Sequence, residues 1–594
     1  MKTVSLSFAI LLCSAFTLFS ASTYYASPDG LSTAACTVDD PGTLDLALSK
    51  AKGATSITNG DTVILLPGIY WRTNSTINLN KKYLTLKGST ADPADTVFHG
   101  IGSQKYLKLF NITQYATIEN LTITNYAGPY GYLTSSIIYS KPADSSTSPR
   151  VNNCIITGCY DEKASYSARA IANGGVFTKC HFIANYGTSR APQMGGAFLQ
   201  FYDCTFKKNS GVDILGRGGD GEKYSTFIIS NCLFEANSVR TMSCGGEVLD
   251  CRFINNVSTE EGTVNAASLL VISNCYFKGN EAGRGGCTYG SNIRAIDCQF
   301  FENRTSDNVI STEYGGGAGY DGIYSNCLFV GNYIRKSNRS YYGGALRGGK
   351  AVNCLFDGNN ASRGGATYNT VSIGCIFTNN SATKWGSANY GGTHTDGLYI
   401  KNNYTATSDA NGGILYGGSF VGCTFMENSS SRYIGYDSKM QNCLLVSNTI
   451  TASGYSIAAN GIYVNSTIAG NKTVNKAAIT GGTYTNTIVI ANDSSLADVG
   501  GGTHIHTLYN TYTGTPSFDE GSIKTASARF CGNGTRKAGP WALKASSPAK
   551  DAGIAVDIFN ESSVDIYGNL RIYKTIDIGC SEFIPFSGLV LMVK

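Results

Sequence analysis

Short stretches of alternating apolar and polar residues recur along most of the chain, and each ends in an asparagine followed by a glycine-rich corner. Residues 272–286 show the pattern, with Cys275 and Phe277 two positions apart and Asn280 three positions later. Residues at i and i+2 of a strand point to the same face. The pattern therefore predicts a short strand whose Cys and Phe side chains face a core.

The motif Cys-x-Phe-x-x-Asn recurs 15 times with a mean spacing of about 24 residues. A period between 20 and 50 residues is typical of solenoid repeats, and this one fits a coil of a parallel β-helix. The anchor positions are Cys154, Cys180, Cys204, Cys232, Cys251, Cys275, Cys298, Cys327, Cys354, Cys375, Leu398, Cys423, Cys443, Ser466 and Thr487. Two positions later the residue is Phe in ten copies and Ile156, Ile400, Leu445, Ile468 or Val489 in the others.

The fifth position after the anchor is asparagine in 14 copies, from Asn185 through Asn403 to Asn492, and Cys159 is the exception. Asparagine tolerates the left-handed backbone of a tight corner, and its amide can bond the same amide in the next coil. We expect an internal ladder of amides with a structural role.

The remaining sequence divides the chain into four parts. Lys2, the apolar residues 8–12 and the small residues Ser20 and Ser22 predict a signal peptide over residues 1–22, and hence a secreted or cell-surface protein. Residues 23–125 form an N-terminal cap and first coils, 126–495 the repeats, and 496–594 the last coils and a C-terminal cap or tail module. No later stretch is apolar for long enough to predict a transmembrane segment.

Composition agrees with an almost entirely β fold. The chain holds 70 Gly, 37 Tyr and 26 Phe, and 15% of its residues are charged. The net charge of +5 is too small to require a polyanionic partner. We expect no nucleic-acid partner and a monomer, because a solenoid grows in one direction as a single body.

The repeats carry a family resemblance. Phe-x-x-Asn, together with Gly-Gly-Ala at 195–197, 343–345 and 364–366, resembles the repeats of the polymorphic outer membrane proteins, bacterial surface β-helix adhesins. Residues 24–30, 42–48 and 60–70 resemble the opening of the pectate-lyase-like superfamily. Residues 546–553, 565–571 and 576–582 resemble the tail module of surface-anchored β-helix proteins. The resemblance implies a right-handed parallel β-helix, with a short capping helix within 42–48.

The 12 anchor cysteines occupy one repeat position, so we interpret them as small buried apolar residues with free thiols. Residues off the ladder are the stronger disulfide candidates: Cys36, Cys244, Cys287, Cys531 and Cys580. No metal site is predicted, because no CxxC pair is present and the five histidines are scattered.

No catalytic residue is predicted. Lyases of the pectate type need carboxylates from neighbouring coils that converge on Ca²⁺, and hydrolases need two facing carboxylates. The third position after the anchor is chemically mixed and forms no carboxylate ladder. Acids outside this register are interpreted as solvated loop charges: Asp213, Asp220, Glu247, Glu260, Glu261, Glu313 and Asp321.

Binding residues are sought among arginines and aromatic residues. Arg217, Arg284, Arg347 and Arg363 each precede Gly-Gly, where they line a groove for acidic glycans or simply form corners. Aromatic residues expected in loops can stack on sugars or a protein partner, or pack at corners. They are Tyr126, Tyr130, Tyr132, Tyr314, Tyr320, Tyr324, Tyr341, Tyr342, Trp385 and Tyr390.

The sequence thus favours a secreted or surface β-helix with a non-catalytic binding or adhesion role, for a polysaccharide or a protein on a neighbouring or host surface. Two alternatives stay open. One is a lyase or hydrolase of uronate-containing polysaccharide, which alone would require Ca²⁺. The other is a purely structural spacer. The fold by itself does not choose between them.

Overall fold

The structure is a computed structural model. It describes residues 21–52, 60–72, 76–79, 83–100, 109–112, 115–128, 137–140, 148–161, 171–187, 193–216, 226–259, 261–306, 315–335, 341–406, 411–532, 539–558, 560 and 562–585.

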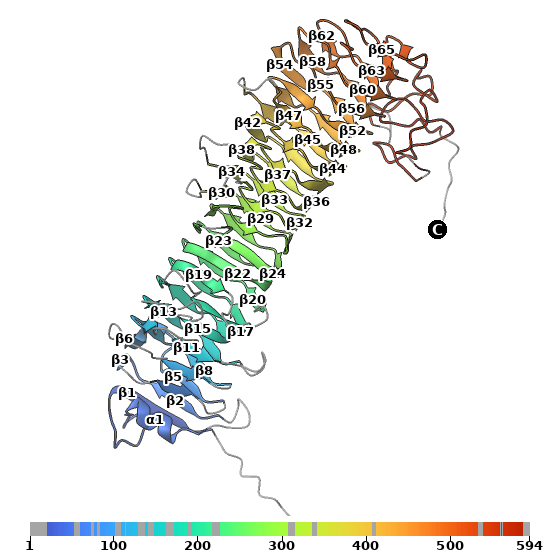
Figure 1. The fold of residues 1–594 in the computed structure, drawn as a ribbon. Helices are drawn as coiled ribbons and strands as arrows, with labels where there is room; N and C mark the ends of the chain where they lie inside the picture. The colour runs from blue at the N-terminus through green and yellow to red at the C-terminus, as the bar shows by residue number, and fades with distance from the viewer. Residues whose placement is uncertain are drawn as a thin grey trace, which may run out of the picture.

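The chain forms an elongated parallel β-solenoid that runs from the blue N-terminal end to the red C-terminal end in Figure 1. One coil contains β28 (Ile293–Ile296), β29 (Gln299–Phe301) and β30 (Arg304–Thr305). These strands pair in parallel with β32 (Ile323–Ser325), β33 (Leu328–Val330) and β34 (Tyr333–Ile334) of the next coil. The predicted all-β parallel solenoid of about 24 residues per coil is confirmed, while its handedness stays a prediction.

Three sheets run along the solenoid, and we number them here. Sheet 1 contains β28 and β32, and it also holds short strands that follow the glycine-rich corners, such as β31 (Gly319–Tyr320). Sheet 2 holds the strands that contain the Phe of each repeat, such as β29 and β33. Sheet 3 comprises ten short strands of the described residues, from β26 (Glu281–Ala282) to β62 (Asp493–Ser494).

The repeat Phe residues form one continuous stack in the core. Phe182, Phe206 and Phe234 are fully buried, and their rings lie 4.9 and 4.5 Å apart with nearly parallel planes. The stack continues through Phe377 to Tyr399 at 4.6 Å. Burial of each ring contributes roughly 1.5–3 kcal/mol, so the stack is a main source of stability.

The predicted asparagine ladder is confirmed. Asn332 Nδ2 donates to Asn359 Oδ1 at 3.1 Å and to the Phe300 carbonyl at 2.9 Å, and the Asn332 backbone N–H donates to the same Asn359 oxygen. The left-handed backbone lies one residue earlier than expected. Gly279, immediately before Asn280, has φ +64°, so the ladder side chain follows the corner instead of forming it.

One coil departs from the predicted register. Strand β45 (Leu398–Ile400) pairs Tyr399 with Phe377, and Asn402 receives the Asn380 bonds. Gly397 therefore occupies the cysteine position, Tyr399 the Phe position and Asn402 the ladder, so the assignments of Leu398, Ile400 and Asn403 are wrong. The shift accommodates the Tyr399 hydroxyl, which accepts from Asn389 Nδ2 at 3.0 Å inside the core.

The N-terminal end holds helix α1 (Leu44–Lys50), beside β1 (Thr23–Leu31) and β2 (Thr62–Leu65). The Thr43 hydroxyl accepts from the Leu46 N–H at 3.2 Å and caps the helix. Leu44 and Ala47 are buried in the same apolar cluster as the first strands. No helix in the described part of the chain is both long enough and apolar enough to cross a membrane.

Cysteines whose side chains the structure describes are all free thiols. The ladder cysteines are buried, as expected, and burial raises the pKa of the Cys443 thiol well above its usual range. The disulfide expectation is wrong for Cys36, Cys287, Cys531 and Cys580. Cys36, Cys287 and Cys580 pack among apolar side chains instead. The side chain of Cys244 lies outside the described residues.

The described residues of 527–532, 539–558 and 562–585 lie beside the last coils (Figure 1), where they pack on the outer face of sheet 2. The outward residues Leu444, Val446 and Ile488 are buried there against Leu543 and Ile578. Backbone groups of this C-terminal module also bond the solenoid. The Cys580 N–H donates to Thr467 Oγ1 at 3.1 Å, and Asn442 Nδ2 donates to the Val564 carbonyl at 2.7 Å.

Candidate functional site

A row of tyrosines interrupted by one arginine crosses seven successive coils on the outer face of sheet 1. Its members are paired in register and half-buried: Tyr289, Tyr320, Arg347, Tyr368, Tyr390, Tyr416 and Tyr436. They lie in β27 (Thr288–Tyr289), β31, β35 (Leu346–Arg347), β39 (Thr367–Tyr368), β43 (Asn389–Tyr390), β47 (Gly413–Tyr416) and β51 (Tyr433–Tyr436). At about 4.8 Å per coil, this tyrosine row is roughly 29 Å long.

Alternation within each short strand produces the row. In β39, Thr367 points into the core and is fully buried, so the next residue, Tyr368, points outward. Because neighbouring coils are in register, the outward rings stack. Tyr390 lies 5.0 Å from Tyr368 and 4.9 Å from Tyr416, with ring planes within 16° of parallel.

A second, shorter row lies beside the first and consists of Tyr342, Arg363 and Trp385. Arg363 ends β38 (Asn360–Arg363), and Trp385 ends β42 (Ser381–Trp385). The Arg363 guanidinium carbon is 4.0 Å from the Trp385 ring centre, and Arg363 Nη1 donates to the Tyr342 hydroxyl at 3.2 Å.

The two rows touch and form one surface, which we name the aromatic stripe. The Tyr342 ring lies 4.4 Å from Tyr368, and the Trp385 ring lies 5.1 Å from Tyr416. The Arg347 side chain extends from the first row toward the second, with its guanidinium carbon 5.0 Å from the Tyr320 ring centre and 5.3 Å from the Tyr342 ring centre. Arginine stacked on aromatic rings is held in place by attraction to their π faces.

Glycine pairs bring the two rows together. Gly364 has φ +66°, a conformation that favours glycine. A Cβ on Gly365 would lie 2.0 Å from the Ser387 carbonyl oxygen of the next coil, so only glycine allows this close approach. The pair therefore turns the chain sharply between Arg363 in the second row and Tyr368 in the first.

The stripe presents hydrogen-bond donors and positive charge. Partial burial, then the neighbouring tyrosines, raises the pKa of Tyr368, so its hydroxyl stays protonated. Burial likewise raises the pKa of Tyr390 and Tyr416. Within the described residues, no carboxylate forms an ion pair with Arg363, and Arg363 Nε and Trp385 Nε1 are buried without a hydrogen-bond partner.

The structure brings together four of the predicted binding residues: Arg347, Arg363, Tyr342 and Trp385. Arg284 lies at one end of the tyrosine row, with Nη1 3.1 Å from Glu261 Oε1 and 3.5 Å from the Tyr289 hydroxyl. Tyr341 does not join them, because it is buried against Ile334 and Ala361. Arg217 lies outside the described residues.

Several further sequence assignments need correction. Tyr320, Trp385 and Tyr390 lie in strands, not loops. Tyr126 and Tyr324 are buried in the core. Tyr130, Tyr132 and Tyr314 are outside the described residues. The four Arg-Gly-Gly segments do not share one position either, since Arg363 belongs to the second row and Arg347 to the first.

Sequence reasoning missed Tyr289, Tyr368, Tyr416 and Tyr436. Most row members stand four residues after the first glycine of a Gly-Gly pair, as in 364–368 and 412–416. That offset is the signal that identifies the row, and it places Arg347 in a tyrosine position. The Cys-x-Phe-x-x-Asn motif does not include this offset.

The acidic residues that the sequence interpretation placed in solvated loops are also located in part by the structure. Asp213 is no solvated loop charge, because it lies in β19 (Ser210–Gly216), is buried and pairs with Arg240 Nε at 2.6 Å. Asp220, Glu260 and Glu313 lie outside the described residues. In the described part of the chain, no group of three or more His, Cys, Asp or Glu residues could hold a metal ion.

No protein-family model matches the sequence, and no curated protein matches it. Solved structures with some similarity include the PL6 family alginate lyase AlyGC, at 11% identity and a TM-score of 0.28, covering 85% of this chain and 99% of that one. Pectate lyase Pel9A matches at 11% identity and a TM-score of 0.14, covering 95% of this chain and 96% of that one. The catalytic unit of the GH87 α-1,3-glucanase of Streptomyces thermodiastaticus matches at 11% identity and a TM-score of 0.24, covering 79% of this chain and 66% of that one. Similarity at this level says nothing about what this chain binds or cleaves.

Proposed function

We propose that the chain is a non-catalytic binding protein that holds an acidic glycan along the aromatic stripe. The observation that carries this proposal is the continuity of the stripe, in which seven coils contribute one outward side chain each in exact register order. A linear ligand parallel to the solenoid axis would meet a tyrosine hydroxyl at six of these coils and the Arg347 guanidinium at the seventh.

The exposed chemistry of the stripe favours a polar polymer. Stacked rings cover one another's faces along the row, so ring edges and hydroxyl groups remain for a ligand. Phenol hydroxyls both donate and accept hydrogen bonds, which suits the hydroxyl groups of a sugar chain. Arg347 and Arg363 add planar guanidinium groups, which bind carboxylates or sulfates with two parallel hydrogen bonds.

The proposal includes an extracellular location for a monomeric chain. The signal-peptide pattern at residues 1–22 supports export, and glycan polymers are abundant at cell surfaces. A right-handed coil with α1 as its N-terminal cap belongs to the same proposal. No cofactor is required for binding of this kind.

The test is retention of the chain from Thr23 onward on immobilised polysaccharides, with polygalacturonate and alginate as acidic probes and cellulose and starch as neutral ones. We expect retention on an acidic polymer, and a several-fold loss in Arg363→Ala and Tyr390→Phe. Lys401→Ala is the matched control, since it removes one exposed positive charge at the corner that follows β45 of sheet 2, outside the stripe.

The same incubations, with and without Ca²⁺, separate the competing hypotheses. Unsaturated products or new reducing ends would replace the proposal with polysaccharide cleavage. Neither retention nor product would favour the structural spacer. Retention that Arg363→Ala leaves unchanged would move the binding site away from the stripe.

A further inference from the structure

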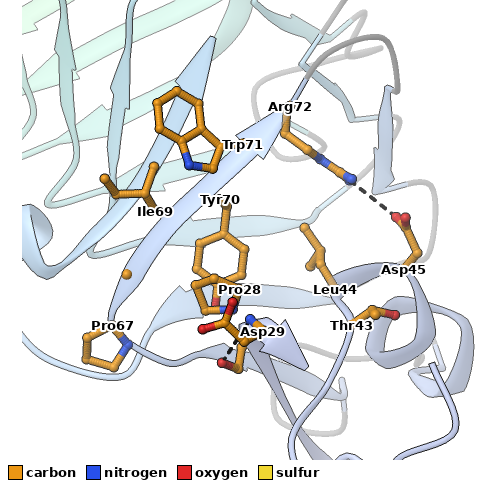
Figure 2. Close-up of a pocket in the computed structure, with 12 residues that line it drawn as sticks. Pro28, Asp29, Thr43, Leu44, Asp45, Pro67, Ile69, Tyr70, Trp71 and Arg72 are labelled. Atoms are coloured by element: carbon orange, nitrogen blue, oxygen red, sulfur yellow. Dashed lines mark hydrogen bonds and ion pairs between the residues drawn. The ribbon is translucent and has the colours of Figure 1, made fainter. Parts of the chain in front are cut away.

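A pocket of about 500 Å³ lies at the N-terminal end of the solenoid, far along the chain from the stripe (Figure 2). It is bounded on one side by β3 (Gly68–Arg72) and on the other by Pro28, Asp29 and the start of α1. Pockets of 300–1,000 Å³ are typical of small-ligand sites.

One contact borders the pocket at each end. At one end Pro28 packs so tightly on Gly68 that a Cβ there would lie 2.7 Å from Pro28 Cγ. At the other, Arg72 Nη2 reaches Asp45 Oδ1 of α1 at 3.2 Å, as the dashed line in Figure 2 shows. Four residues of strand span about 13 Å. The space therefore suits a compact ligand.

The rim of the pocket is aromatic. Trp71 is 58% exposed, a large apolar surface to leave in water. Its ring is held in place by His99 of β6 (Thr96–Gly100), with ring centres 4.5 Å apart. An exposed ring that a neighbour holds rigid is suited to stacking on the apolar face of a sugar.

Charged residues line the pocket, and its two carboxylates are solvent-exposed. Asp45 is 75% exposed, and Asp29 has no ion-pair partner among the described residues. Arg72 Nε is buried without a hydrogen-bond partner, and a buried donor of this kind costs free energy until it is satisfied. Strand β3 pairs only with β6 among the described strands, so one backbone edge faces the pocket.

We propose that this pocket binds a neutral or amino saccharide of one or two rings. Trp71 would stack on the sugar, while Asp29, Asp45 and Arg72 would bond its hydroxyl or amino groups. Two carboxylates against one guanidinium give the pocket a net negative charge, which disfavours a uronate. The stripe therefore favours an acidic ligand, whereas the pocket favours a neutral or positively charged one. The proposal for one site can be wrong while the proposal for the other holds.

The experiment is calorimetric titration of the chain from Thr23 onward with cellobiose, maltose, lactose, chitobiose and digalacturonate. We expect at least one neutral or amino disaccharide to bind at least tenfold more tightly than digalacturonate, and Trp71→Ala to lose at least tenfold of that affinity. Leu496→Ala, which truncates another exposed apolar residue, is the control and should bind as the unaltered chain does.

Asp29→Asn provides a second variant if Trp71→Ala fails to fold. It should weaken an amino sugar more than a neutral one, because it removes a negative charge and keeps the shape. The proposal is overturned if none of the neutral or amino disaccharides binds, if digalacturonate binds most tightly, or if Trp71→Ala binds unchanged.

Discussion

The Arg363 guanidinium carbon lies 4.0 Å from the Trp385 ring centre, and the two residues are paired neighbours in adjacent coils. Arginine and tryptophan thereby hold each other at the centre of the aromatic stripe. Such a contact contributes about 0.5–2 kcal/mol, more when water is excluded. It keeps the guanidinium plane fixed before any ligand arrives, which lowers the entropy cost of binding.

Arg363→Lys tests whether the planar group or only the charge matters. Lysine keeps the positive charge but lacks the flat, forked donor set. We expect affinity for an acidic polysaccharide to fall about tenfold, equivalent to ~1.4 kcal/mol, with altered Trp385 fluorescence. Affinity measured by retention or titration should be compared with Lys401→Ala. Equal affinity of Arg363→Lys and the unaltered chain would reduce the site to simple charge attraction.

Asn332→Ala tests the amide ladder. The substitution leaves the Phe300 carbonyl without its side-chain donor and the Asn303 amide without its acceptor, all inside the core. Each buried unsatisfied group costs about 1–3 kcal/mol, so the denaturation midpoint should fall clearly. Asn360→Ala, one residue away from the ladder and half-buried, should have a much smaller effect. Equal midpoints for the two variants would contradict the ladder as a source of stability.

The repeat made the fold predictable, because the Cys, Phe and Asn positions serve the same contact in every coil. The stripe was only partly predictable. Its residues lie on the outer face, where core packing does not dictate the residue type. Three of its tyrosines, Tyr289, Tyr368 and Tyr416, emerge only from their offset to Gly-Gly, and Tyr436 lacks even that signal. Tyr341 and Tyr342 show the difficulty, since adjacent residues of one type point to opposite sides, one buried and one in the stripe.

The C-terminal module illustrates a signal that the sequence carried but the repeat concealed. Outward positions of sheet 2 become apolar at Leu444, Val446, Ile488 and Ile490, where the module covers them. Earlier coils place Lys207 and Glu235 in equivalent outward positions, as an ion pair at 2.7 Å. A change of outward residues from charged to apolar is what a covered surface requires.

His394 makes stability depend on pH. Burial lowers the pKa of this imidazole to about 4, although its contact with the Gly391 carbonyl opposes the shift. Because the folded protein lowers the pKa of His394, it favours the neutral imidazole. The contribution of His394 to the free energy of unfolding is therefore complete above pH 6.5 and is lost as pH falls toward 4. The loss is about 3 kcal/mol. His394→Phe, stacked on Phe420, should flatten the dependence of the urea midpoint on pH between 4 and 6.5. An unchanged slope would exclude His394 as the cause.

Two buried acids should make the C-terminal module respond to pH in the opposite direction. Burial, reinforced by Asp577, raises the pKa of Glu582 to about 8, and burial raises the pKa of Asp577 to about 6. A carboxyl group whose pKa is raised in the folded protein stabilises the fold when it is protonated. The contribution is therefore greatest below about pH 4 and is lost as pH rises through 6 and 8.

Trp541 reports on this module, because it packs edge-on against Phe530 and close to Gly470 of the solenoid. We expect its fluorescence transition in urea to shift to lower urea between pH 5 and 8.5. Glu582→Gln, which stays uncharged, should remove the part of the shift above pH 6. A shift of equal size in Glu582→Gln would assign the pH response to other groups.

Gly397 and Tyr399 offer the sharpest test of the core. A Cβ on Gly397 would lie 2.9 Å from the Tyr399 ring, so Gly397→Cys alone should destabilise by about 1–3 kcal/mol through overpacking. Tyr399→Phe alone removes the hydroxyl that pairs with Asn389. Together they recreate the Cys-x-Phe pair of the adjacent coils, Cys375 with Phe377 and Cys423 with Phe425, in which both side chains fit. We expect the double variant to lose at least ~1 kcal/mol less free energy of unfolding than the two single variants lose together. The free energies of unfolding of all four forms are measured by denaturation. Additive losses would show that the Tyr399 hydroxyl is not the reason for glycine at position 397.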